Sequence, residues 1–365
     1  MTDISTTTPT GGLLQGFEAI VRSAGLAGCR FFAGYPMAPF TQLLEEFGRR
    51  LPELGGVCIN AESEIEAVNM ALGAASTGAR AATGSVGQGI ALMQEAIAEA
   101  AFTELPLVVF NVARGQQDYF QATRGGGWGD YRTYTLAPKD VREAAEHTQM
   151  LFHVADRYRV PTLLYADYLI AHTQVSLSVE ALDLPELPAK EWALDGRSGG
   201  TGVAKEIFAF DMGKTNAPGL GPDRHWNNVA SKFADMAVSE SRWEAQHTDD
   251  AEALVVAFGT SAAFVEYVVE ELRSDGRRIG TFRPITLWPF PYDPLRAVSA
   301  AVERVLVFEL NAGQMVDDVL IAVENRGKVT SIGGLSQDAH GLRQGPLLDA
   351  VVIRERILEH LGGSR

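Results

Sequence analysis

The chain has 365 residues, 46% of them hydrophobic, and this length and composition predict two domains with separate cores. Its formal net charge of −15 argues against nucleic acid or an anionic membrane surface as a partner. The two cysteines, Cys29 and Cys58, form no CxxC pair, so we expect no iron–sulfur cluster and no structural metal site in this chain. The threonine-rich start lacks the basic-then-apolar pattern of a signal peptide, and no apolar run approaches the ~20 residues that span a bilayer. We therefore expect a cytoplasmic protein.

Helical and extended patterns alternate through the first half of the chain. We expect helices over residues 16–27, 41–51, 60–77, 90–103 and 141–158, and strands over 29–33, 57–59, 80–83, 107–112 and 160–165. This alternation predicts a parallel sheet with helices on both faces, in which ligands bind at the carboxyl ends of the strands. The turns at Gly34, Glu64, Gly87 and Arg114 each follow a predicted strand, so we expect them to converge on one edge of the sheet.

The stretch over residues 60–77 is the most informative of these elements. Asn60 or Ser63 can cap its helix, and three glutamates crowd the first turn: Glu62, Glu64 and Glu66. The positions that follow are apolar almost all round, which predicts a buried helix: Ile65, Val68, Met70 and Leu72. Capping and the helix dipole account for two of the glutamates, and a chemical role for one of them is equally consistent with the spacing. The spacing alone does not identify which one.

Proline and glycine interrupt the pattern between residues 176 and 246, where we expect a connecting segment with a helix over 228–240. The α/β alternation then resumes. Strands are predicted over 253–258, 278–282 and 305–309, and helices over 262–274, 294–301 and 315–323. This predicts a first domain over residues 1–175 and a smaller one over 247–365. The Gly259-Thr-Ser261 turn could bind a phosphate through helix-start amides, but a tight strand–helix turn is the favoured interpretation.

Several motifs, taken together and in order, resemble those of 2-oxoacid:ferredoxin oxidoreductase α subunits. Gly34-Tyr-Pro-Met-Ala-Pro39 is similar to the Gly-Tyr-Pro-Ile-Thr-Pro signature of that family. Further motifs follow in the family's order: Ala61-Glu-Ser-Glu64, Gly87-Gln-Gly89 and Val112-Ala-Arg-Gly115. Three segments resemble the branched-chain, 2-oxoisovalerate type most closely: residues 118–132, 283–291 and 309–314. Each motif is weak alone, but the ordered set extends from about residue 11 to residue 334.

The resemblance implies a fold and a division of labour. It implies a thiamine-diphosphate pyrimidine-binding-type domain followed by a transketolase-C-like domain, both doubly wound α/β. The enzymes cleave a 2-oxoacid with thiamine diphosphate, release CO2, pass electrons through iron–sulfur clusters to ferredoxin and transfer the acyl group to coenzyme A. A β subunit holds the diphosphate and its Mg²⁺, and the [4Fe-4S] clusters lie in the β and ferredoxin-like subunits, beside a γ subunit. The absence of cluster cysteines here is consistent with that arrangement.

The resemblance also implies roles for particular residues. Glu64 falls on the family's activating glutamate, which favours the imino form of the aminopyrimidine ring and so promotes loss of the thiazolium proton. Arg114 falls on the arginine that binds the substrate carboxylate, next to Ala38 and Pro39. Two loops are implied to contact the cofactor, through Tyr35, Pro36, Gly87, Gln88 and Gly89. No metal ligand is implied in this chain.

Four departures from the family pattern leave the substrate and two alternatives open. Ala38 replaces a threonine, Trp128 replaces a histidine, Val86-Gly-Gln88 replaces Ser-Gly-Pro, and the Gly/Pro-rich insert after Arg114 is missing. These changes could enlarge the pocket for an aryl or bulky 2-oxoacid. One alternative is a subunit of a non-oxidative thiamine enzyme, which iron and acid-labile sulfide in the purified complex would exclude. The other is a non-catalytic paralogue, against which the retention of Glu64 and Arg114 argues.

Overall fold

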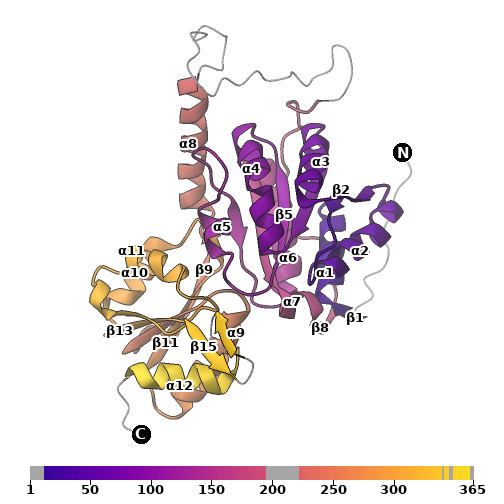
Figure 1. Cartoon of the computed structure of the whole chain (residues 1–365). Helices are drawn as coiled ribbons and strands as arrows, with labels where there is room; N and C mark the ends of the chain where they lie inside the picture. The colour runs from indigo at the N-terminus through magenta and orange to yellow at the C-terminus, as the bar shows by residue number, and fades with distance from the viewer. Residues whose placement is uncertain (1–11, 195–221, 339–340, 345–347, 362–365) are drawn as a thin grey trace.

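The computed structural model describes residues 12–194, 222–338, 341–344 and 348–361. A seven-stranded sheet forms the larger unit (Figure 1), in the order β12-β6-β7-β5-β4-β2-β3. Its strands are β2 (Cys29–Gly34), β3 (Val57–Asn60), β4 (Arg80–Ser85), β5 (Leu107–Ala113), β6 (Tyr134–Leu136), β7 (Pro161–Asp167) and β12 (Thr286–Trp288). All neighbouring strands are parallel except β12, which pairs antiparallel with β6. Parallel pairing requires helical crossovers, as the alternating pattern predicts.

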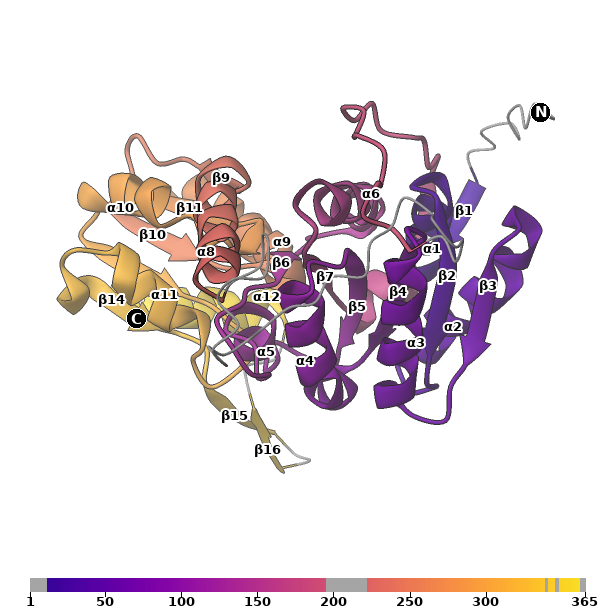
Figure 2. The same ribbon diagram turned by 90° about the horizontal axis from the view of Figure 1, so that it is seen from above.

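Helices cover both faces of this sheet. They are α1 (Gly16–Leu26), α2 (Thr41–Arg50), α3 (Glu64–Ser76), α4 (Gly87–Phe102), α5 (Tyr119–Thr123), α6 (Val141–Tyr158) and α7 (Tyr168–His172). Helices α1 and α6 pack together on one face, and α3 and α4 lie side by side on the other (Figure 2). The short strands β1 (Gly12–Gln15) and β8 (Gln174–Leu177) pair beside α1. Strand β5 is buried along its whole length, as a central strand of a doubly wound sheet must be.

A five-stranded sheet forms the smaller unit, in the order β14-β13-β10-β11-β9. Its strands are β9 (Trp243–Gln246), β10 (Ala253–Val256), β11 (Ile279–Pro284), β13 (Arg304–Val307) and β14 (Val329–Ser331). The accompanying elements are α9 (Gly259–Ser274), α10 (Tyr292–Ala300), α11 (Met315–Ala322), α12 (Ala350–Leu361) and the β15 (Leu335–Asp338)–β16 (Gly341–Gln344) pair. Helix α8 (Pro222–Ser239) packs against the first unit, where Trp226 contacts Phe102 and Lys232 bonds Glu104. Two 3₁₀ turns span Pro52–Leu54 and Arg326–Lys328. The predicted α/β pattern is therefore present in both units.

The sequence pattern did not predict the two edge strands β9 and β12, and β12 joins the two units to each other. Strand β12 comes from the second half of the chain but completes the edge of the first sheet. Strand β9, which falls in the expected connecting segment, pairs antiparallel with β11. The predicted helix over 228–240 exists but begins earlier, at Pro222. Much of the remaining connecting segment, residues 195–221, lies outside the described residues.

Two other expectations are wrong. Helix α3 is not buried all round: Ile65 is 50% exposed and Met70 is 40% exposed, because α3 packs on the sheet and α4 with only one face. The second error concerns the Gly84–Gly89 segment, which was expected to be a loop. Helix α4 begins at Gly87, so the glycines form its first turn. Within the described part of the chain, no helix is long and apolar enough to cross a membrane.

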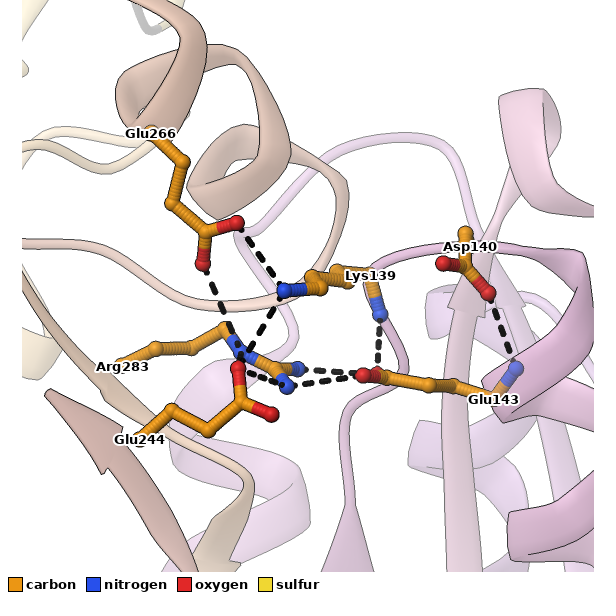
Figure 3. Close-up of polar contacts among 6 residues, drawn as sticks. All are labelled: Lys139, Asp140, Glu143, Glu244, Glu266 and Arg283. Atoms are coloured by element: carbon orange, nitrogen blue, oxygen red, sulfur yellow. Dashed lines mark hydrogen bonds and ion pairs between the residues drawn. The ribbon is translucent and has the colours of Figure 1, made fainter. Parts of the chain in front are cut away.

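A cluster of five charged side chains ties the two units together (Figure 3). We call it the charged cluster: Lys139, Glu143, Glu244, Glu266 and Arg283. The Arg283 guanidinium, only 2% exposed, makes two 2.8 Å bonds to the Glu143 carboxylate and a third 2.8 Å contact with Glu244. The Lys139 ammonium lies 2.9 Å from Glu266 and 3.2 Å from Glu244. Lys139 and Glu143 belong to the first unit and the other three to the second, so the cluster fixes the junction between them.

Candidate active site

The structure brings the predicted turns together at the carboxyl edge of the first sheet. Strands β2, β4 and β5 end there in register, with Gly34 opposite Gly84 and Ser85 opposite Asn111. The start of the α3 segment is tied to the same edge, because the Ala61 amide donates to the Gly34 carbonyl at 2.9 Å. The convergence follows from parallel pairing, which puts every strand end on one side.

Glu64 is the buried carboxylate of this edge. It is the first residue of α3 and is only 3% exposed. The Ser85 hydroxyl, at the end of β4, donates to Glu64 Oε1 at 3.1 Å. A Cβ on Gly89 would lie 2.0 Å from Ser85 Oγ and 2.6 Å from Glu64 Oε1, so no larger residue fits there. Glycine at position 89 thus lets the first turn of α4 approach the carboxylate.

The other two glutamates of the first turn have different surroundings. Glu62 and Glu66 are exposed. Ser63 caps the helix by accepting from the Glu66 amide at 3.3 Å, and the Glu66 carboxylate accepts from the Glu62 amide at 2.9 Å. Ser63 rather than Asn60 is therefore the cap, and the Glu66 carboxylate bonds the residue before it. Capping and burial are divided between different residues, and Glu64 takes no part in the cap.

A second carboxylate, Asp118, faces the first residue of α4. A Cβ on Gly87 would lie 2.0 Å from Asp118 Oδ1, so this glycine too permits a close approach. The Asn111 side-chain amide donates to Asp118 Oδ2 at 3.2 Å. Burial raises the pKa of Asp118, although the Asn111 bond and the charge of Arg114 act to lower it. Gln88, between the two glycines, is exposed.

Arg114 and Ala38, both expected near the substrate, are in direct contact. Arg114 follows β5, its side chain is exposed, and its Nε and Nη2 donate to the Ala38 carbonyl at 3.0 and 2.7 Å. The Ala38–Pro39 peptide bond is cis. Among the described residues Arg114 makes no ion pair with Asp118 or Asp130. Since a guanidinium carries five N–H donors, three of them remain available for an anion.

The remaining predicted residues lie on the loop between β2 and α2. Tyr35 and Pro39 are half-buried and Pro36 is exposed. Pro36 also lines a hollow of about 270 Å³ together with Thr41 and Cys58. Within the described residues, no group of three or more His, Cys, Asp or Glu side chains could hold a metal ion.

The Gly259-Thr-Ser261 turn is a structural contact. The Gln116 side chain fills the space beside it, donating to the Phe258 carbonyl at 3.0 Å and to Ser261 Oγ at 3.1 Å. Gly259 adopts a φ of +59°, which favours glycine. The tight-turn interpretation therefore holds, and the turn binds the first unit of the same chain.

Sequence reasoning did not single out Ser85, Asn111 and Gln116. Ser85 and Asn111 lie at the ends of β4 and β5, and a rule that examines the polar residues at every strand end would have selected both. The Asn111 Oδ1 atom is buried and has no partner among the described residues. No sequence pattern marks Gln116, because its hydrogen-bond partners are 142 and 194 residues away in the chain.

Comparison with known proteins defines the class and then the family. Residues 22–236 match the thiamine-diphosphate-binding domain of the pyruvate flavodoxin/ferredoxin oxidoreductases, and residues 251–344 match pyruvate:ferredoxin oxidoreductase core domain II. The class is thus a thiamine-diphosphate-binding domain joined to a second α/β domain. The chain belongs to the 2-oxoacid:ferredoxin oxidoreductase family, as a subunit of that oxidoreductase.

Two relatives and one solved structure illustrate the match. The chain is 34% identical to the ketoisovalerate oxidoreductase subunit VorB of Methanothermobacter thermautotrophicus, over 85% of this chain and 89% of that protein. It is 33% identical to the 2-oxoglutarate synthase subunit KorA of the same organism, over 90% and 95%. The fold resembles the 2-oxoglutarate:ferredoxin oxidoreductase of Magnetococcus marinus, solved with 2-oxoglutarate, coenzyme A and succinyl-CoA, at a TM-score of 0.78 and 23% identity. That comparison covers 96% of this chain and 65% of the other.

Proposed function

We propose that this chain supplies the pyrimidine side of a thiamine-diphosphate site shared with a partner subunit, in a coenzyme A-acylating 2-oxoacid:ferredoxin oxidoreductase. The observation that carries the proposal is Glu64, a carboxylate buried at the carboxyl edge of the sheet with Ser85 as its hydrogen-bond partner. Glycine at position 89 lets the first turn of α4 pack against that carboxylate. These residues fit the aminopyrimidine ring, and the matched thiamine-diphosphate-binding family supports the assignment.

Glu64 holds a proton at the ring nitrogen in this proposal. A carboxyl group that is nearly excluded from water can share a proton with a ring nitrogen without competition from solvent. The Ser85 hydroxyl orients the carboxyl group through Oε1. When bound, thiamine diphosphate supplies the carbanion that attacks the 2-oxo carbon. The Tyr35–Pro36 loop and the Gly87–Gly89 turn border the same edge and complete this chain's part of the cofactor site.

Arg114 binds the carboxylate of the 2-oxoacid. Two of its donors are held by the Ala38 carbonyl, which leaves the rest of the planar fork for an anion. Ala38 offers no hydroxyl to that anion, so recognition of the carboxylate depends on Arg114 and on main-chain groups near Pro39. The identities to a ketoisovalerate and to a 2-oxoglutarate enzyme subunit are nearly equal, and both substrates have the carboxylate that Arg114 would bind.

The rest of the reaction belongs to partner subunits. We assign the diphosphate, its Mg²⁺ and the [4Fe-4S] clusters to β and ferredoxin-like partners. A γ subunit completes the complex, and ferredoxin accepts the electrons in the cytoplasm. Apolar side chains exposed on α3 and α4 support a partner at these helices: Ile65 is 50% exposed, Met70 40% and Leu92 53%. A protein chain that covers α3 and α4 would bury these side chains and close the site over Glu64.

The test is hydrogen–deuterium exchange at C2 of thiamine diphosphate bound to the assembled complex. Glu64→Gln keeps the size and hydrogen bonding of the side chain but cannot hold the ring proton, so exchange should slow by roughly 10²–10⁴-fold. Glu62→Gln and Glu66→Gln are the matched controls, since both glutamates are exposed and flank Glu64 in the chain. Glu66→Gln should change only helix stability, by about 0.3–1 kcal/mol. Equal exchange rates in all three variants would remove Glu64 from the chemistry.

A further inference from the structure

Gln116, two residues after Arg114, has its whole side chain bonded to the second unit. It is 3% exposed. Its Nε2 donates to the Phe258 carbonyl at 3.0 Å and to Ser261 Oγ at 3.1 Å, and its Oε1 accepts from the Leu310 amide at 2.7 Å. Both ends of the amide are thus held by backbone or hydroxyl groups that start α9 or follow β13. An amide with donor and acceptor both satisfied in a buried site has one preferred position.

The Gln116 backbone is held by the second unit as well. Its carbonyl accepts from the Asn311 side-chain amide at 2.7 Å, and its N–H faces the Leu310 carbonyl at 3.4 Å. Asn311 is fully buried, and its own Oδ1 accepts from the Gly313 amide at 2.8 Å. The segment 309–314 therefore bonds both the side chain and the main chain of residue 116.

Arg114 lies between this anchor and the first sheet. Strand β5 ends at Ala113, the residue before it. The carbonyl of Gly115, the residue after it, accepts from Tyr165 Oη at 3.3 Å. Successive Cα atoms are only about 3.8 Å apart. A segment of one or two residues therefore cannot absorb a displacement of the sheet or of residue 116. The backbone position of Arg114 is consequently set by both units of the molecule.

We propose that Gln116 is a positioning residue that fixes Arg114 for the carboxylate of the 2-oxoacid, so that the second domain contributes to substrate affinity through residue 116. The inference rests on the proposed role of Arg114. Bidentate recognition of a carboxylate requires the guanidinium in one plane and at one distance, and a misplacement of about 1 Å can cost on the order of 10²-fold in rate or affinity. Gln116 itself touches no part of the site.

The test uses the assembled complex carrying Gln116→Met, which keeps the length of the side chain and removes its three hydrogen bonds. We expect KM for the 2-oxoacid to rise roughly 10-fold or more, because Arg114 loses its fixed position. Thiamine diphosphate affinity and C2 exchange should stay unchanged, since Glu64 is held by Ser85 and not by the second unit. A fall in C2 exchange equal to the rise in KM would overturn the proposal, because it would indicate a general loosening.

Gln314→Met is the matched control. The Gln314 side chain also joins the units, donating to the Gln117 carbonyl at 2.9 Å and accepting from the Phe120 amide at 3.0 Å. Gln314→Met leaves the hydrogen bonds of Gln116 intact. KM should therefore rise less than about 2-fold, as expected for a residue that is not coupled to Arg114. An equal rise of KM in both variants would mean that the junction as a whole, and not Gln116, sets the affinity.

A double-mutant cycle with Arg114→Ala separates the inference from the proposed function. If Gln116 acts through Arg114, Gln116→Met should change KM less than 2-fold in the Arg114→Ala background, in contrast to independent sites, whose effects add. Additive effects would overturn the inference and leave the proposed role of Arg114 intact. A KM unchanged by Arg114→Ala alone would instead refute both.

A milder variant covers the case in which Gln116→Met does not assemble. Ser261→Ala removes one of the three side-chain bonds of Gln116, while Phe258 and Leu310 keep the other two. KM should then rise about 2- to 5-fold, as expected for the loss of one of several hydrogen bonds. An unchanged KM in a folded Ser261→Ala complex, together with a Gln116→Met chain that does not assemble, would assign Gln116 to folding alone.

Discussion

Among the contacts between the two units, which include the β12–β6 pairing, two sets of polar side chains differ in chemistry. The charged cluster joins the units by ion pairs, whereas a neutral set joins them by amides; we call the second set the amide staple: Gln116, Asn311 and Gln314. Both sets border α9, the staple at its first residues and the cluster at Glu266. The staple lies next to the segment that carries Arg114, and the cluster holds α6 against β9 and β11.

The two sets differ in how much they contribute to stability and in how closely they fix the direction of a contact. Breaking an ion pair whose partners are buried is costly, and the strength of an ion pair responds to salt and pH. An amide pair contributes little net stability, yet its donors and acceptors fix direction and distance. The charged cluster is thus suited to holding the units together, and the amide staple to setting where the residues near Arg114 lie. Three measurements would break or sharpen this division.

Replacement of Arg283 should produce the largest effect. Arg283→Met removes the central cation, and Glu143 and Glu244 are left without their common partner. Breaking a buried ion pair on one side typically costs about 3–5 kcal/mol, so the free energy of unfolding in urea should fall by roughly that amount. Glu244→Gln is the control, because Glu244 is 42% exposed and should cost less than about 1 kcal/mol. A loss below 1 kcal/mol for Arg283→Met would show that water already compensates the carboxylates.

Acid should weaken the junction through His147, which lies on α6 one turn after Glu143. Burial, with the charges of Arg283 and Arg242, lowers the pKa of His147 from its ordinary 6.5 to about 3. Between pH 6.5 and pH 3 the unfolded chain binds a proton at His147 and the folded chain does not. The free energy of unfolding therefore falls as the pH falls through this range. Between pH 6.5 and 5 the loss should be about 2 kcal/mol.

The measurement is the free energy of unfolding against pH, compared between the native chain and His147→Gln. The variant carries no titrating group at this position, so its curve should be flatter by that amount over the same pH range. Parallel curves would show that His147 titrates normally in the folded chain.

The smallest effect should come from the amide staple. Gln314→Met removes two hydrogen bonds at a half-buried side chain and should lower the free energy of unfolding by about 1–2 kcal/mol. The loss should be the same in about 0.05 M NaCl, where charges are weakly screened, and in about 1 M NaCl, where they are strongly screened. The reason is that Gln314→Met removes no charge. Glu244→Gln should by contrast lose part of its effect at high salt. Salt dependence of Gln314→Met would contradict the division between the two sets.

Much of the fold could be predicted from local pattern. Strand β5 reads as an apolar run broken only by Asn111, and α6 as an amphipathic helix over 141–158, because burial on both faces or on one face imposes those patterns. Strands β6 and β12 escaped prediction because each has three residues, too few to show a period. Their pairing depends on where the second unit docks, which no local pattern encodes.

The candidate site divides in the same way. The sequence determined that Gly34, Glu64, Gly87 and Arg114 would meet at one edge, since each follows a parallel strand. It could not separate Glu62, Glu64 and Glu66, because the pattern places all three near one helix start and one dipole. Tertiary structure decided that Glu64 points to Ser85 while Glu66 accepts from the Glu62 amide. It also decided the contacts of Gln116, because residues that meet only after the two units dock leave no periodic trace in the chain.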